Sequence, residues 1–92
     1  MNKEEFILYW IKKNDGHIDT MNTFFVDDYA ERFKPKKINY KMWGADNIPE
    51  LTNLLKKMFD EGKLVRYIVN INPRPAGFPK WIYSYHLKEI ES

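Results

Sequence analysis

The chain has 92 residues, which is enough for one domain with one modest hydrophobic core. It contains no cysteine, which excludes disulfides, thiolate metal sites and cysteine nucleophiles and fits a reducing compartment, so we expect a cytoplasmic location. No apolar run reaches the roughly 20 residues of a membrane span, and the charged N-terminus has no small-residue cleavage site that would predict a signal peptide.

The net charge of +2 is unevenly distributed along the chain. Residues 1–31 sum to −4, residues 32–88 to +8, and the tail at residues 89–92 to −2. A basic segment of this size is typical of a surface that faces a polyanion. The alternative is that the acidic and basic parts attract each other across the fold.

Two helices are predicted in the acidic part of the chain. The first spans residues 3–13, because Phe6, Ile7, Trp10 and Ile11 recur at helical spacing, and the sequence Asn-Asp-Gly at residues 14–16 ends it. A short extended segment is expected near Ile18. The second helix spans about residues 21–33, with Thr20 as its N-cap and an end before Pro35. Its apolar positions are Met21, Phe24, Phe25, Tyr29 and Phe33, and we assign Phe24 and Phe25 to the core.

A third helix is predicted from Asn47 to Glu61, after an irregular segment with a turn at Trp43-Gly44. Asn47 and Glu50 have the spacing of a capping box, and a proline in the first turn costs no hydrogen bond. Gly62 is expected to end the helix. The apolar stripe is formed by Leu51, Leu54, Leu55, Met58 and Phe59.

After Gly62 the apolar period changes from about 3.6 residues to 2, which predicts strands. The strands span residues 64–72 and 80–87, and a loop rich in proline joins them as a β-hairpin. One side of the first strand carries Val65, Tyr67, Val69 and Ile71, and one side of the second carries Trp81, Tyr83, Tyr85 and Leu87. Because an isolated hairpin is marginally stable in water, this one must pack against the helices.

Residues 51–66, LTNLLKKMFDEGKLVR, resemble the junction between recognition helix and wing in winged helix transcription regulators. In that family the helix carries leucines at these spacings, ends at a glycine and continues as a Leu-Val-Arg strand. The resemblance implies a single α+β winged helix-turn-helix domain over residues 1–92. It also implies duplex DNA binding, through a recognition helix at about residues 47–61 and a wing at about 72–80, by a transcription regulator or an accessory factor in DNA transactions.

The implied DNA-binding residues fall into three groups. Four exposed positions lie on the recognition helix, four lysines precede it, and two cations lie on the wing: Thr52, Asn53, Lys56, Lys57, Lys34, Lys36, Lys37, Lys41, Arg74 and Lys80. Asparagine can pair bidentately with adenine, whereas flexible lysines suit phosphates. Each residue also has an ordinary interpretation as part of a solvated helix face or an exposed loop.

No catalytic constellation is recognisable, so we expect neither an enzyme nor a bound cofactor or metal. His17 and His86 are isolated in the sequence and have no metal-ligand spacing around them. Asp27 and Asp28 are neighbours on a helix, where adjacent side chains diverge, so they suit neither a shared metal nor an acid–base pair.

A protein-interaction module on the same scaffold is the alternative function, since a fold does not fix a function. Its partner surface would be the two acidic helices. A homodimer through the first helix is a further expectation, because residues 6–11 are six consecutive apolar residues and one helix face buries only about half of them. Basic residues that converge on one face would favour DNA, and scattered ones would favour a protein partner.

Overall fold

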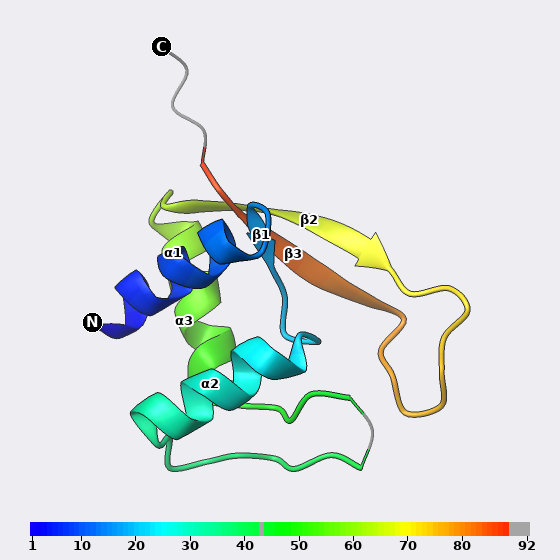
Figure 1. Cartoon of the computed structure of the whole chain (residues 1–92). Coiled ribbons are helices and arrows are strands. Elements are labelled where there is room, and N and C mark those ends of the chain that lie inside the picture. Colours follow the sequence, from blue (N-terminus) through cyan, green and yellow to red (C-terminus); the bar gives the residue numbers. More distant parts are fainter. Residues whose placement is uncertain (43, 89–92) are drawn as a thin grey trace.

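The structure is a computed structural model that describes residues 1–42 and 44–88 (Figure 1). Its elements in chain order are α1 (Lys3–Lys13), β1 (His17–Ile18), α2 (Thr23–Phe33), α3 (Pro49–Asp60), β2 (Leu64–Asn70) and β3 (Trp81–Leu87). The strands form an antiparallel sheet in the order β1-β3-β2. The chain is therefore a small α+β domain, and the predicted strand near Ile18 is confirmed. Trp43 of the predicted turn and the acidic tail at 89–92 lie outside the described residues.

Helix α1 has the predicted bounds because both of its ends are encoded locally. The Asn2 side chain accepts a hydrogen bond from the Glu5 amide, and the Glu5 carboxylate accepts one from the Asn2 amide. This capping box satisfies backbone N–H groups that have no partner within the helix. Of the apolar run at residues 6–11, only Leu8 and Tyr9 are not buried, and Tyr9 is 45% exposed. The apolar surface left for a homodimer is therefore small, and the dimer stays a prediction.

The predicted starts of the other two helices are wrong. Helix α2 begins at Thr23, because the Asn22 side chain, rather than that of Thr20, accepts the capping hydrogen bond from the Phe25 amide at 3.1 Å. Helix α3 begins at Pro49 and has no side-chain cap. The backbone of Asn47 instead pairs with that of Asn39, at 2.8 and 2.9 Å, so that Asn47 closes the preceding segment into a loop.

Phe24 is the clearest error in the predicted core. Its side chain is 78% exposed, whereas Phe25 is fully buried. Phe25, Tyr29 and Phe33 repeat every four residues and set the inward face of α2. Phe24 is about 100° away from Phe25 on the helix surface, on the side that carries Asp28.

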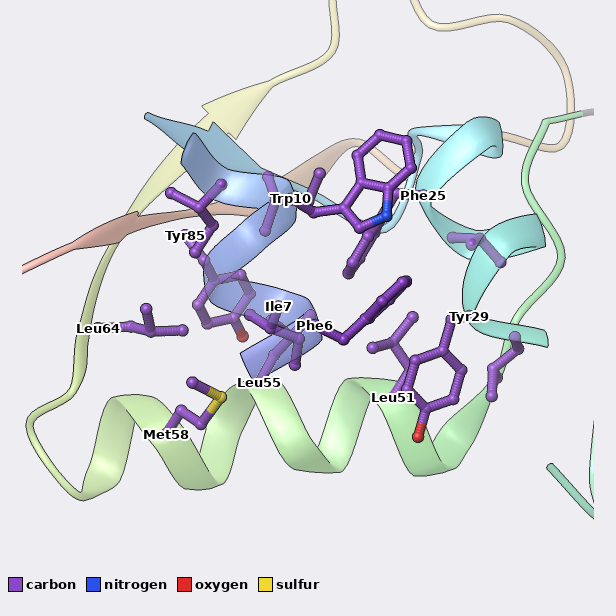
Figure 2. Packing of buried hydrophobic residues seen from close by; sticks show 14 of the residues in the cluster. Phe6, Ile7, Trp10, Phe25, Tyr29, Leu51, Leu55, Met58, Leu64 and Tyr85 are labelled. Carbon is purple, nitrogen blue, oxygen red and sulfur yellow. The ribbon is translucent and has the colours of Figure 1, made fainter. Parts of the chain in front are cut away.

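Aromatic rings of α1 and α2 form a cluster within the core (Figure 2). The buried ring of Phe6 stacks on Phe25 at 5.8 Å and meets the edges or tilted faces of further rings at 5.3–6.5 Å: Trp10, Tyr29 and Phe33. Helix α3 closes the core with Leu51, Leu55 and Met58, and the sheet adds Ile18, Leu64 and Tyr85.

One end of the hairpin packs against the helices, and the other end projects away from them (Figure 1). Strands β2 and β3 pair from Leu64↔Leu87 to Asn70↔Trp81, a slightly shorter span than predicted. Only Leu64, Ser84 and Tyr85 of these strands are buried. The outer residues of β2, including Tyr67, Ile68 and Val69, are exposed on both faces, so burial in this part of the strand does not alternate.

Truncation of the central ring tests this account of the core. Phe6→Ala should lower the free energy of unfolding by about 3–5 kcal/mol, because a large buried side chain is replaced by a cavity. The matched change Phe24→Ala should alter it by less than about 0.5 kcal/mol, because that ring is solvated. Urea denaturation of both variants measures the difference, and equal losses would contradict the assignment of the two rings.

Candidate nucleic-acid interface

Helix α3 presents one polar arc to solvent, as predicted. Leu51, Leu55 and Met58 are buried on one side, and Thr52, Asn53, Lys56 and Lys57 are exposed on the other. At 3.6 residues per turn these four positions span about 140° of the helix surface. Their grouping therefore follows from the apolar stripe that fixes the helix on the core.

The two borders of this arc face different parts of the molecule. Thr52 lines an apolar hollow together with Trp81 and Tyr83 of β3, so one border faces the hairpin. Lys57 lies 3.9 Å from Glu4 of α1, so the other border faces the first helix. Asn53 lies between the borders, and its side chain forms no hydrogen bond within residues 1–42 and 44–88.

Charges on the α1 border of α3 neutralise one another. Glu4 binds Lys63 at 2.6 Å, which lowers the pKa of the carboxyl group and raises that of the ammonium group. Lys57 and Lys63 also lie within 4.0 Å of Glu61. Lys3, also at this border, pairs with Glu50 at 3.0 Å. Because each of these three lysines already has a carboxylate partner, this border attracts a polyanion less than unpaired lysines would.

The segment before α3 and the loop of the hairpin meet beside the start of α3. We call residues 34–48 the linker and residues 71–80 the hairpin loop. The ring of Phe78 packs on Gly44 so closely that a Cβ atom at residue 44 would lie 3.3 Å from it. Lys41 of the linker, Thr52 of α3 and Pro79 of the hairpin loop line one small hollow of about 80 Å³. The fold therefore brings the hairpin loop to the linker and the start of α3, from which it is distant in the sequence.

The cations of the linker and hairpin loop are exposed, and no salt bridge within the described parts of the chain engages them: Lys34, Lys36, Lys37, Lys41, Arg74 and Lys80. Lys56 and Lys57 of α3 differ, since Lys56 binds Asp60 at 2.8 Å and Lys57 faces Glu4. The predicted basic residues thus divide into an unpaired set on the loops and a paired set on the helix. Lys41 lies beside α3, whereas Lys57 lies on the opposite border.

Arg66 has a structural role that its position in the sequence does not reveal. Its guanidinium group lies 4.0 Å from the ring centroid of Phe59 on α3 and 4.0 Å from that of Tyr83 on β3. Such stacking is favourable and joins the hairpin to α3. The alternation of polar and apolar residues places Arg66 in a strand. It does not show that the side chain of Arg66 lies between the rings of Phe59 and Tyr83.

The two histidines are not isolated in space, which corrects the sequence interpretation. His17 of β1 and His86 of β3 are register partners, with ring centroids 5.7 Å apart. The Ser84 hydroxyl lies 3.0 Å from Nε2 of His86, and burial together with the nearby His17 lowers the pKa of His86. This pairing depends on the register of two strands distant in sequence, so no local motif announces it. The described residues contain no group of three or more His, Cys, Asp or Glu side chains arranged to hold a metal.

Comparison of the chain with protein-family models, with curated proteins and with solved structures finds no match. Among the described residues, no helix combines the length and the apolar character needed to cross a membrane.

A buried tyrosine alters the pKa of a carboxyl group in the first turn of α3. The Tyr29 hydroxyl donates a hydrogen bond to Glu50, and this bond, followed by that from Lys3, lowers the pKa of the Glu50 carboxyl below its ordinary value of 4.5. The ionised carboxylate therefore stabilises the folded state above pH 4.5, and this contribution should disappear as the pH falls through the folded-state pKa.

Tyr29→Phe keeps the ring in the core but removes the hydrogen-bond donor. The variant should lose less stability than the wild type between pH 6 and about pH 3, because the pKa of Glu50 returns toward its unfolded value. Urea denaturation across this pH range measures the effect. Parallel stability curves for the two proteins would show that the bond does not favour the ionised carboxylate.

Proposed function

We propose that the domain is a winged helix module that binds duplex DNA, with α3 as the reading helix. The observation that carries the proposal is the meeting of the linker and the hairpin loop beside the exposed arc of α3, with unpaired cations on both loops. The order of elements, in which β1 pairs with β3 and the hairpin follows α3, supports the winged helix part of it.

The shape of α3 and its surroundings suits a major groove. The groove of B-DNA is about 12 Å wide and admits one α-helix. The face that would enter it has Asn53 near its centre, with an amide that is free within the described parts of the chain. Because an asparagine amide matches the N6 and N7 atoms of adenine, Asn53 is the best candidate for reading a base.

The linker departs from the helix-turn-helix pattern, in which a turn of 3–4 residues joins the two helices. Here residues 34–48 separate α2 from α3, and the Asn39–Asn47 backbone bridge closes part of this segment. The departure argues against a strict helix-turn-helix unit. This longer linker also supplies the lysines at residues 36, 37 and 41, which we propose contact the phosphate groups of the DNA backbone.

The ion pairs refine this assignment on α3 itself. Lys57 lies at the neutralised α1 border, so we expect it to contribute less than the cations of the linker and hairpin loop. Lys56 shares its charge with Asp60, but exposed pairs of this kind contribute only about 0–1 kcal/mol, so a phosphate can compete for the lysine. The DNA would therefore lie toward the hairpin side of α3.

A protein partner is the second candidate function, and the exposed ring of Phe24 favours it. This ring is 78% exposed on α2 beside the acidic residues Asp27 and Asp28. An exposed aromatic side chain with carboxylates three and four residues further along the helix suits a basic, partly apolar partner. Absence of DNA binding would leave this candidate as the better one.

Removal of one linker cation tests the phosphate contacts. The wild type should bind random duplex DNA with an affinity that falls as salt rises, and Lys41→Ala should reduce the slope of log K against log salt by about one. Fluorescence anisotropy at several salt concentrations measures both quantities.

Lys63→Ala is the matched control, because it makes the same change of charge at the neutralised α1 border. It should leave the slope unchanged. A wild type whose binding is insensitive to salt, or equal losses in the two variants, would refute the proposed surface.

Base reading by Asn53 has its own test. Once a preferred duplex has been selected from random sequences, Asn53→Ala should weaken its binding by about 1–3 kcal/mol. The same variant should bind random duplex almost as the wild type does, because phosphate contacts dominate there. An equal loss on both duplexes would show that the asparagine reads no base.

A further inference from the structure

We propose that His17 and His86 form a binding site for one divalent transition-metal ion of the Zn²⁺, Ni²⁺ or Cu²⁺ class. The two imidazoles would bind the ion from adjacent strands, and water would complete its coordination. This site does not depend on the proposed DNA binding.

The backbone register places the two side chains together. His17 and His86 are direct partners in the antiparallel β1–β3 pair, in which opposed side chains on one face are close neighbours. Their ring centroids are 5.7 Å apart and their planes differ by 39°. With Zn–N bonds of 2.0–2.1 Å, two imidazoles on one tetrahedral ion have centroids about 5 Å apart. The observed separation is close to this value, and binding would require the side chains to rotate until one nitrogen of each ring faces the ion.

The surroundings of the pair suit an imidazole site. Ser84 lies 3.0 Å from Nε2 of His86, and a hydroxyl that accepts from Nε2–H leaves the lone pair of Nδ1 for a metal. Beside His86 is an open hollow, lined also by Val65, Tyr67, Leu87 and Lys88, through which an ion and its water can enter.

The ligand set also selects the class of ion. Two neutral nitrogen donors suit Zn²⁺, Ni²⁺ and Cu²⁺, whereas Mg²⁺ and Ca²⁺ require oxygen ligands. Within the described parts of the chain no third His, Cys, Asp or Glu joins the pair in a metal-holding group, so the site is open rather than a closed structural zinc centre.

Metal binding would have a direct structural effect. Strand β1 contains two residues and makes two register pairs with β3, so it is the shortest edge of the sheet. An ion that bridges the two histidines would join this edge to β3. Because it would bind the folded register and not the unfolded chain, it would raise the stability of the fold with its concentration.

The experiment titrates the untagged full chain with Zn²⁺ and follows the imidazole nitrogen signals of both histidines by NMR, together with the melting temperature. We expect the signals of His17 and His86 to change together at one Zn²⁺ concentration and the melting temperature to rise. Mg²⁺ should cause neither effect. A change at one histidine only, or at neither, would overturn the proposal without any variant being made.

Three variants complete the test, with folding checked by circular dichroism. His17→Gln and His86→Gln should each weaken Zn²⁺ binding more than 10–100-fold, because loss of a residue that only supports a ligand already costs about 10–100-fold. Each variant should also abolish the rise in melting temperature. Tyr67→Phe, beside His86 on the same face, should bind as the wild type does. Wild-type affinity in either folded glutamine variant would overturn the site.

Discussion

The buried ring of Phe6 lies where α1 meets α2, and the orientation of α3 follows from the cluster around it. Pairs of aromatic rings contribute about 0.5–1.5 kcal/mol each beyond the area they bury, so four contacts to one ring fix the two helices firmly. Tyr29 belongs to this cluster, and its hydroxyl binds Glu50 in the first turn of α3. The apolar stripe of α3 and this one polar contact together determine which residues of the helix face solvent.

Electrostatics then separates the exposed surface into two parts. Around α1 and the adjoining border of α3, carboxylates and lysines pair within 4.0 Å of each other. The linker and hairpin loop keep cations that no described carboxylate engages, and a charged ligand approaching from solution would be attracted to them first. Attraction between the acidic and basic parts of the chain therefore accounts for the lysines at the α1 border. It does not account for the exposed cations of the linker and hairpin loop.

Local signals in the sequence predicted the elements well, whereas tertiary contacts decided their details. The bounds of α1 and the change of period after Gly62 depend on neighbouring residues alone, and both predictions hold. Asn47 does not cap α3 because its backbone pairs with that of Asn39. Glu50 does not complete the predicted capping box because its carboxylate binds Tyr29 and Lys3 instead. The histidine pair and the ion pair of Lys57 likewise depend on segments brought together only by the fold.

The side chains of β3 that face α3 and the histidine of the proposed metal site lie on opposite faces of the strand, because successive side chains of a strand alternate. Tyr83 and Tyr85 point toward α3 and the core, where Arg66 stacks between Tyr83 and Phe59 and joins the hairpin to α3. His86 points to the other face, beside His17 and the ring of Tyr67. An ion held by the histidines would not compete for space with DNA on α3. It would instead join the edge strand β1 to β3, so any link between the two sites would act through the stability of the fold rather than through contact.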